Sequence, residues 1–131
     1  HSIAVSESTP VDGKRTFLNA WAAGARPTAV LAMSDIIALG VLSAAQELGL
    51  SVPEDLSIVG FDDIPAAQLC RPALTTVCQP TLEKGMLAAR LLIDRQSGNE
   101  RIEHRILPAA LVVRESTAPA RGAGPCNGHH A

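Results

Sequence analysis

Residues 27–63 read PTAVLAMSDIIALGVLSAAQELGLSVPEDLSIVGFDD, and this stretch decides the fold. Two apolar runs, at 28–33 and 56–61, have the composition of buried strands. Between them, apolar residues at helical spacing over 36–48 predict a helix, and 51–55 predict a loop. Strands that are apolar throughout are typical of a parallel sheet covered by helices on both faces. The order strand, helix, strand therefore predicts an α/β fold with a right-handed crossover.

The residues before this stretch predict one more strand and one more helix. Weak alternation over 2–6 indicates a strand. Asp12 is a suitable N-cap for a helix from about Gly13 to Ala23, which Gly24 ends.

The residues after it alternate between breaks and short regular segments. Prolines interrupt an irregular stretch, which is followed by a short strand. Small and apolar residues at helical spacing come after that strand. In chain order we expect an irregular stretch at 64–72, a strand at 74–77, a helix at 82–94 capped by Thr81, a polar turn at 97–104, a strand at 106–113 interrupted by Pro108, and a disordered tail over 118–131.

The composition indicates a globular protein that does not itself bind nucleic acid. The chain has 131 residues, which allows one domain at most, and 47% of them are hydrophobic. The formal net charge is −2, and the basic residues are scattered apart from the pair Lys14–Arg15. A phosphate backbone requires clustered basic side chains, and a protein with 2% aromatic residues offers few platforms for bases.

The cysteines and the hydropathy pattern bear on the compartment. Cys70, Cys78 and Cys126 are odd in number and have no CxxC spacing, which favours free thiols in a reducing compartment. No apolar run approaches the ~20 residues of a membrane span. We therefore expect a cytoplasmic protein that does not contact a membrane.

Acidic side chains follow both predicted strands of the central stretch. Ser34 and Asp35 come after the first strand, and Asp62 and Asp63 after the second. Ligands of open parallel sheets bind beyond the carboxyl ends of the strands, and Asp accepts hydrogen bonds from sugar hydroxyls. The alternative is that Asp35 caps a helix and Asp63 serves a turn. Adjacent residues on an extended chain point in opposite directions, so Asp62 and Asp63 should not share one site, and of these two we expect Asp62 to face the ligand.

Catalytic patterns are absent from the sequence. There is no GxGxxG, phosphate-binding loop or GxSxG motif. The four histidines, His1, His104, His129 and His130, fall near the termini or in the polar turn. We expect no catalytic residues, no cofactor and no metal site.

Three motifs in order carry a family resemblance. Residues 27–63 closely resemble the signature of the lactose-repressor/galactose-repressor (LacI/GalR) family, and PALTTVCQP (72–80) and LPAALVVRESTA (107–118) resemble its later motifs. The resemblance implies part of a type I periplasmic-binding-protein-like fold, with a doubly wound, mostly parallel sheet and a small effector held between two subdomains.

The resemblance also implies particular residues for the effector site. Ser34 and Asp62 match positions that commonly contact the effector, and Asp35 matches a neighbour that often has a structural role. Thr81 lies where several members place a side chain, often an aromatic one, against the effector. For a homodimer interface the resemblance implies Ile36, Leu39, Leu42, Ser43, Cys70 and Leu74.

The same resemblance divides the chain between two subdomains. Residues 1–79 would form part of the C-terminal subdomain, 80–104 would cross into the N-terminal subdomain, 105–117 would return, and 118–131 would be a tail. Family members bind operator DNA through a headpiece that this sequence lacks. The expected partners are therefore a sugar-like effector and a second copy of the chain.

Two other classes of protein remain open from the sequence. One is a periplasmic sugar-binding protein of the same fold, and the other is an enzyme of the doubly wound class. Sequence upstream would separate the first from a regulator, through an export signal or a helix-turn-helix. An enzyme would require a nucleophile, metal cluster or cofactor loop.

Overall fold

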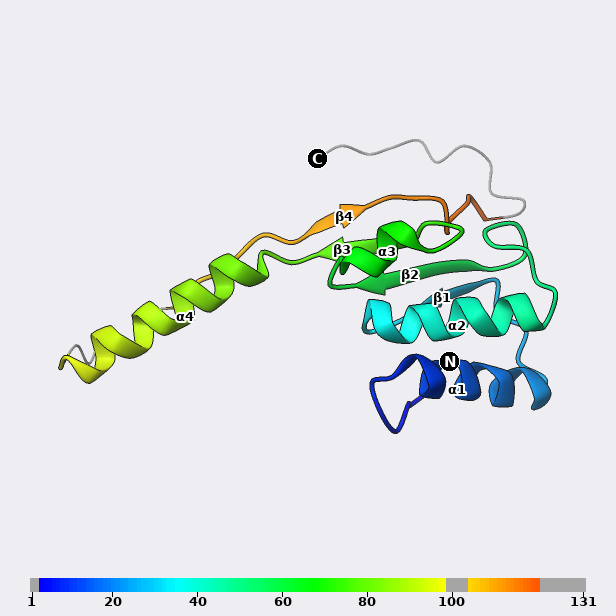
Figure 1. Cartoon of the computed structure of the whole chain (residues 1–131), viewed down its shortest axis with the longest axis horizontal. Coiled ribbons are helices and arrows are strands. Elements are labelled where there is room, and N and C mark those ends of the chain that lie inside the picture. The colour runs from blue at the N-terminus through cyan, green and yellow to red at the C-terminus, as the bar shows by residue number, and fades with distance from the viewer. Residues whose placement is uncertain (1–2, 99–103, 121–131) are drawn as a thin grey trace.

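The computed structural model describes residues 3–98 and 104–120. Four helices and four strands alternate along these residues (Figure 1). In chain order they are α1 (Pro10–Ala22), β1 (Ala29–Leu31), α2 (Asp35–Glu47), β2 (Ser57–Phe61), α3 (Pro65–Leu69), β3 (Thr75–Cys78), α4 (Thr81–Gln96) and β4 (Ala110–Val112).

The strands form one sheet in the order β1-β2-β3-β4. The first three strands are parallel, with Val30 opposite Ile58 and Gly60 opposite Thr76. β4 pairs with β3 in the antiparallel direction, with Leu111 opposite Val77. The predicted α/β class and the parallel crossover through α2 are therefore confirmed.

The core lies between this sheet and α2, with α1 as an outer layer against α2 (Figure 1). α2 begins at Asp35, one residue before the predicted start, because the Ser34 hydroxyl caps it by accepting a hydrogen bond from the N–H of Ile37 at 3.3 Å. Alternate strand residues face the core. The main buried apolar side chains are Phe17, Ala32, Val41, Leu42, Leu56, Ile58 and Leu74.

The opposite face of β1 is not covered by the described helices. Leu31 is 71% exposed and the following Met33 is 80% exposed, whereas Val30 and Ala32 pack in the core. Although the run 28–33 is apolar, only one of its two faces is therefore buried against the described residues. Exposed apolar side chains on a sheet are typical of a surface that meets another part of a protein.

Two predictions on the N-terminal side are wrong. Residues 3–6 form no strand, because the backbone N–H groups of Ser6 and Glu7 donate instead to the Asp12 carboxylate. α1 begins at Pro10, three residues earlier than expected. Its N-cap is Thr9, whose side chain accepts from the N–H of Asp12 at 3.1 Å. Proline at the first helical position needs no N–H partner, which explains the earlier start.

The C-terminal half also departs from expectation. The stretch 64–72 contains the short helix α3, and the last strand covers only Ala110–Val112. Thr81 is the first residue of α4 and not its cap; Pro80 occupies that position and makes no side-chain hydrogen bond. Most of the predicted turn at 97–104 and of the predicted tail lies outside the described residues.

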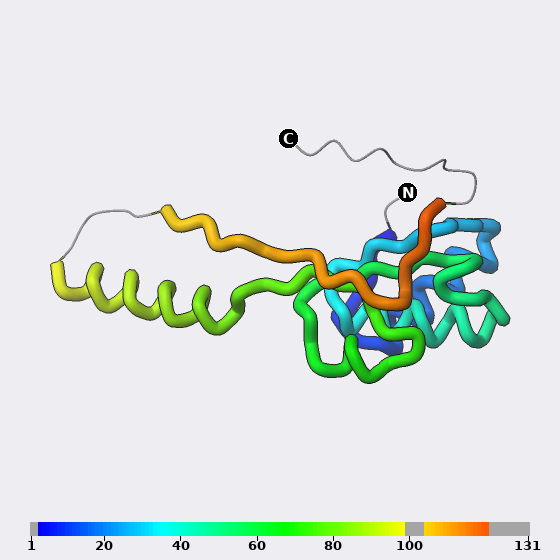
Figure 2. Tube along the Cα trace, turned by 90° about the horizontal axis from the view of Figure 1, so that it is seen from above, coloured from blue at the N-terminus to red at the C-terminus, as the bar shows by residue number. Residues whose placement is uncertain are grey.

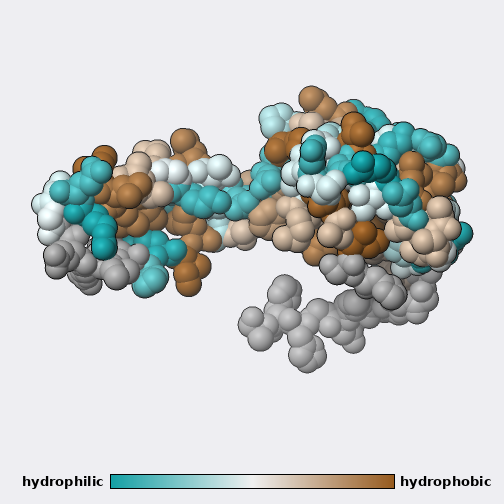
Figure 3. Space-filling model, turned by 90° about the horizontal axis from the view of Figure 1, so that it is seen from below, coloured by the Kyte–Doolittle hydropathy of each residue, from teal (hydrophilic) through white to brown (hydrophobic). Residues whose placement is uncertain are grey.

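α4 and the chain that leads back from it extend away from the sheet as an arm (Figures 1 and 2). No residue of α4 is buried. Apolar side chains lie on the surface of this arm (Figure 3), among them Leu82 at 80%, Met86 at 66% and Ile106 at 98% exposed. No helix in the described parts of the chain has the length and apolar character that a membrane crossing requires.

Candidate functional site

The carboxyl ends of β2 and β3 meet at the base of the arm. Directly after β2, Asp62 and Asp63 adopt positive φ angles of 113° and 54°. Such angles are uncommon outside glycine and are best tolerated by Asn and Asp. The N–H of Asp62 donates to the carbonyl of Val77 at 2.9 Å, which ties this turn to β3. The turn holds the two adjacent carboxylates in different environments.

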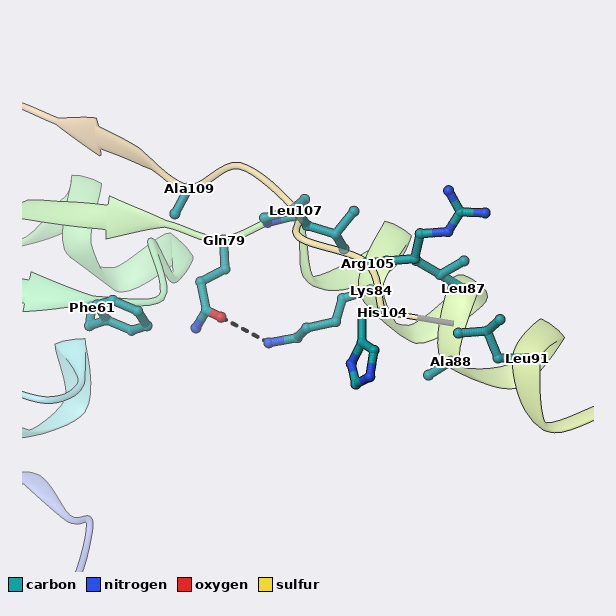
Figure 4. Close-up of a pocket in the computed structure, with 11 residues that line it drawn as sticks. Phe61, Gln79, Lys84, Leu87, Ala88, Leu91, His104, Arg105, Leu107 and Ala109 are labelled. Atoms are coloured by element: carbon teal, nitrogen blue, oxygen red, sulfur yellow. Dashed lines mark hydrogen bonds between the residues drawn. The ribbon is translucent and has the colours of Figure 1, made fainter. Parts of the chain in front are cut away.

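Asp62 has an exposed side chain that faces Gln79, the residue after β3. Gln79 Nε2 donates to Asp62 Oδ1 at 2.7 Å, and Lys84 Nζ donates to Gln79 Oε1 at 2.8 Å. Lys84 lies on the first turns of α4, and Figure 4 shows its side chain extended toward Gln79. One glutamine amide thus connects a carboxylate on the sheet to an ammonium group on the arm.

A pocket of about 460 Å³ opens beside this connection (Figure 4). The sheet contributes Phe61 and Gln79, and α4 contributes Lys84 together with apolar side chains. The chain before β4 closes the other side. The remaining lining residues are Pro80, Leu87, Ala88, Leu91, His104, Arg105, Leu107 and Ala109. The volume of this pocket falls within the range of small-molecule binding sites.

Asp63 does not face this pocket. Its Oδ1 pairs with Arg114 NH2 at 2.6 Å, and both side chains are largely buried. Arg114 NH1 also donates to the carbonyl of Leu74 at 2.8 Å. Arg114 therefore fastens the turn after β2 to the start of β3, a structural role that fits the expectation of a turn residue.

Asp35 is fully buried and supports the same turn from below. Its Oδ2 accepts from the N–H of Ile64 at 2.9 Å, and its Oδ1 accepts from the Thr76 hydroxyl at 2.5 Å. A Cβ atom on Gly60 would collide with Oδ1, so the strand needs glycine there. With no exposed surface, Asp35 is placed to position the site and not to touch a ligand.

None of the four residues expected at the effector site lines the pocket: Ser34, Asp35, Asp62 and Thr81 are all outside its lining. The Ser34 hydroxyl caps α2 and lies 3.5 Å from the Ser8 hydroxyl. Thr81 is exposed, and its hydroxyl donates to the carbonyl of Gln79 at 3.4 Å. Gln79 and Lys84 were not predicted as site residues from the sequence. Gln79 had a usable signal, since it directly follows a parallel strand that neighbours β2.

The residues expected at a dimer interface divide into two groups. Leu42 is 4% exposed and Leu74 is fully buried within this single chain, so for these two the expectation is wrong. Both pack in the core between α2 and the sheet. The other four are partly exposed: Ile36, Leu39, Ser43 and Cys70. Leu69, next to Cys70, is 77% exposed.

Within residues 3–98 and 104–120, no three side chains of the metal-ligating types lie close enough to hold an ion. The described cysteines Cys70 and Cys78 are free thiols.

Comparison with known proteins places the chain in a family. The periplasmic-binding-protein-like domain matches residues 3–117. The HTH-type transcriptional repressor CytR of Escherichia coli is 49% identical over 92 residues, 70% of this chain and 27% of the repressor. A LacI-type transcription regulator from Bifidobacterium animalis superposes with a TM-score of 0.81 at 31% identity, covering 89% of this chain and 42% of that one.

A LacI family regulator from Enterococcus faecium, solved with bound ribose, gives a TM-score of 0.74 at 36% identity over 85% of this chain and 41% of that one. The chain belongs to the periplasmic-binding-protein-like domain family, in the form found in LacI/GalR transcription regulators. It spans about a quarter of the length of the curated repressor, and these relatives are regulators, not enzymes.

Proposed function

We propose that this chain is the effector-sensing part of a LacI/GalR-type transcription regulator and that its effector is a sugar or related polyol. The exposed Asp62 carboxylate carries the proposal, because it is hydrogen-bonded to Gln79, which lines the pocket. A carboxylate accepts hydrogen bonds from two hydroxyls at once, as vicinal diols require. Asp35 and Asp63 would position this turn, and Ser34 and Thr81 would approach the effector from the rim.

The arm fits a position between two lobes. Residues 80–104 would belong to a second lobe, and 105–117 would return to the lobe that contains the sheet. Closure of two lobes over a ligand is a standard way to transmit binding. Operator DNA would be bound by a headpiece outside this chain, in a cytoplasmic protein that catalyses no reaction.

The substitution Asp62→Asn tests the effector site. Asparagine tolerates the positive φ and keeps the shape, but it replaces a charged acceptor by a neutral one. We expect affinity for the cognate sugar to fall about tenfold, or about 1.4 kcal/mol, by isothermal titration calorimetry on the complete polypeptide that carries this sequence. Asp94→Asn, an exposed change on α4, is the matched control and should leave affinity unchanged. Equal affinity of the Asp62→Asn protein and the unmodified protein would remove Asp62 from the site.

We further propose that the partly exposed residues around α2 and α3 form a homodimer contact. Leu69 is the test position, because it is 77% exposed beside Cys70 and makes no core contact. A charge buried in an apolar contact is strongly unfavourable. Leu69→Arg should therefore shift the sedimentation coefficient from dimer to monomer. Leu92→Arg, on the exposed arm, should not. A dimer that persists in Leu69→Arg would exclude this surface.

A further inference from the structure

The pocket beside Asp62 has an uneven charge distribution. Lys84, His104 and Arg105 line it, and none of the described residues that line it is acidic. The neighbouring Asp62 carboxylate is already engaged by the Gln79 amide. A carboxylate acceptor, Asp62, therefore lies next to the pocket on the far side of Gln79, and cationic or donor groups line the pocket along the arm.

Lys84 is the decisive residue of this lining. Among the described residues its one recorded polar partner is the neutral amide oxygen of Gln79, at 2.8 Å. Its ammonium group carries three donors, and a neutral acceptor occupies one of them. Hydrogen bonds from an ammonium group to an anion are roughly twice as strong as those between neutral groups. An anionic group would therefore bind Lys84 more strongly than Gln79 does.

Gln79 fixes the distance between the two charged side chains, Asp62 and Lys84. Its amide nitrogen binds Asp62 and its amide oxygen binds Lys84, so one rigid planar group separates the acceptor end from the cationic end. Figure 4 shows Phe61 on the sheet side of Gln79, and Leu87 and Leu91 farther along α4 than Lys84, so apolar surface lies on both sides of the Gln79–Lys84 contact. That surface suits the carbon face of a sugar ring.

We propose that the effector is an anionic polyol, with hydroxyls bound at Asp62 and a phosphate or carboxylate bound at Lys84. This inference rests on the proposed function and narrows its ligand class. Gln79 is the residue that fixes the spacing between hydroxyl and anion. Lys84 is the residue that selects charged sugars over neutral ones.

The test compares matched ligands on the complete polypeptide that carries this sequence. Calorimetry would measure ribose against ribose 5-phosphate, and glucose against glucose 6-phosphate and glucuronate, with inorganic phosphate alone as a reference. We expect one charged sugar to bind at least tenfold more tightly than its neutral parent. The measurements with the sugar phosphates and with glucuronate then show which anion the site accepts.

Lys84→Gln should abolish this preference, so that the charged sugar binds no more tightly than its neutral parent. Arg90→Gln removes a positive charge from the same helix at a position outside the pocket, so it should retain the preference. Neutral sugars that bind as tightly as charged ones, or a preference that survives Lys84→Gln, would overturn the inference and leave sugar sensing intact. Binding of none of these ligands would overturn both.

Discussion

At the scale of single residues, Asp12 illustrates how one carboxylate organises a loop. Its Oδ2 accepts from the N–H groups of Ser6 and Glu7, both at 2.7 Å, and from the Ser6 hydroxyl at 2.9 Å. Its Oδ1 pairs with Arg15. The backbone N–H of Glu7 and the hydroxyl of Ser6, aided by Arg15, hold the pKa of Asp12 below its usual value, although partial burial opposes them.

This lowered pKa predicts a pH dependence of folding stability. A carboxyl group with a depressed pKa in the folded state stabilises the protein above its unfolded pKa of about 3.9. That contribution is lost as the pH falls through the lower, folded pKa. Asp12→Asn should therefore be less stable than the unmodified protein at pH 7, and the gap should narrow below about pH 4. Urea midpoints at pH 7, 4 and 3 measure it, with Asp94→Asn as an exposed control. A gap independent of pH would contradict this role.

The neighbouring residues Asp62 and Asp63 show what the sequence reveals at this scale. Their position after a buried strand, and the opposite orientation of adjacent side chains, predicted that they would not share one site, and the structure gives them different partners. The sequence did not identify the partners Gln79 and Arg114. Arg114 is 51 residues from Asp63, and only the antiparallel return of the chain through β4 brings the two together.

At the scale of elements, the α1–α2 contact depends on glycine. A Cβ atom on Gly40 would collide with the carbonyl oxygen of Pro10 and lie 2.8 Å from the backbone nitrogen of Lys14. A Cβ atom on Gly13 would lie 2.7 Å from the carbonyl oxygen of Ile37. The two helices thus approach backbone to backbone at both positions.

Gly40→Ala should therefore destabilise the protein, against the usual preference for alanine in helices. Alanine is favoured over glycine in a helix by about 1 kcal/mol, but overpacking against rigid backbone costs about 1–3 kcal/mol. We expect a net loss of up to about 2 kcal/mol, measured by urea denaturation. Gly85→Ala is the matched control, because nothing lies within 4 Å of a Cβ atom there and α4 keeps the full helical gain. If Gly40→Ala and Gly85→Ala change the free energy of unfolding alike, α1 and α2 do not meet backbone to backbone at Gly40.

Element boundaries could be predicted where local signals suffice. Ser34 caps α2 and Gly49, at a φ of 69°, follows its end, and the bounds of the helix lie within one residue of the predicted 36–48. The strand predicted over 106–113 covers only 110–112, and these bounds could not be predicted because they depend on how far β3 continues beside it. Residues 3–6 likewise lack a neighbouring strand in the described chain, so weak alternation alone was insufficient.

At the scale of the whole molecule, burial is distributed unevenly. The core cluster involves α1, α2, the sheet and α3, whereas α4 contributes no buried residue. The exposed apolar side chains of the arm include Leu82, Met86, Leu92, Ile93 and Ile106. Isolated helices of this length are marginal in water without packing. The stability of α4 therefore depends on packing against a further surface.

Hydrogen exchange on the 131-residue chain by itself should separate these two regions. Local opening free energies follow burial and contact density, so amides of 81–96 should exchange orders of magnitude faster than those of 35–47. Mass spectrometry of peptides from each helix measures the difference. In the complete polypeptide that carries this sequence, a lobe that covers Leu82 and Met86 should slow exchange in α4 and leave α2 nearly unchanged. Equal protection of both helices in the 131-residue chain would mean that α4 is already packed, by self-association or otherwise. Dilution separates these cases, because only protection that comes from self-association declines with concentration.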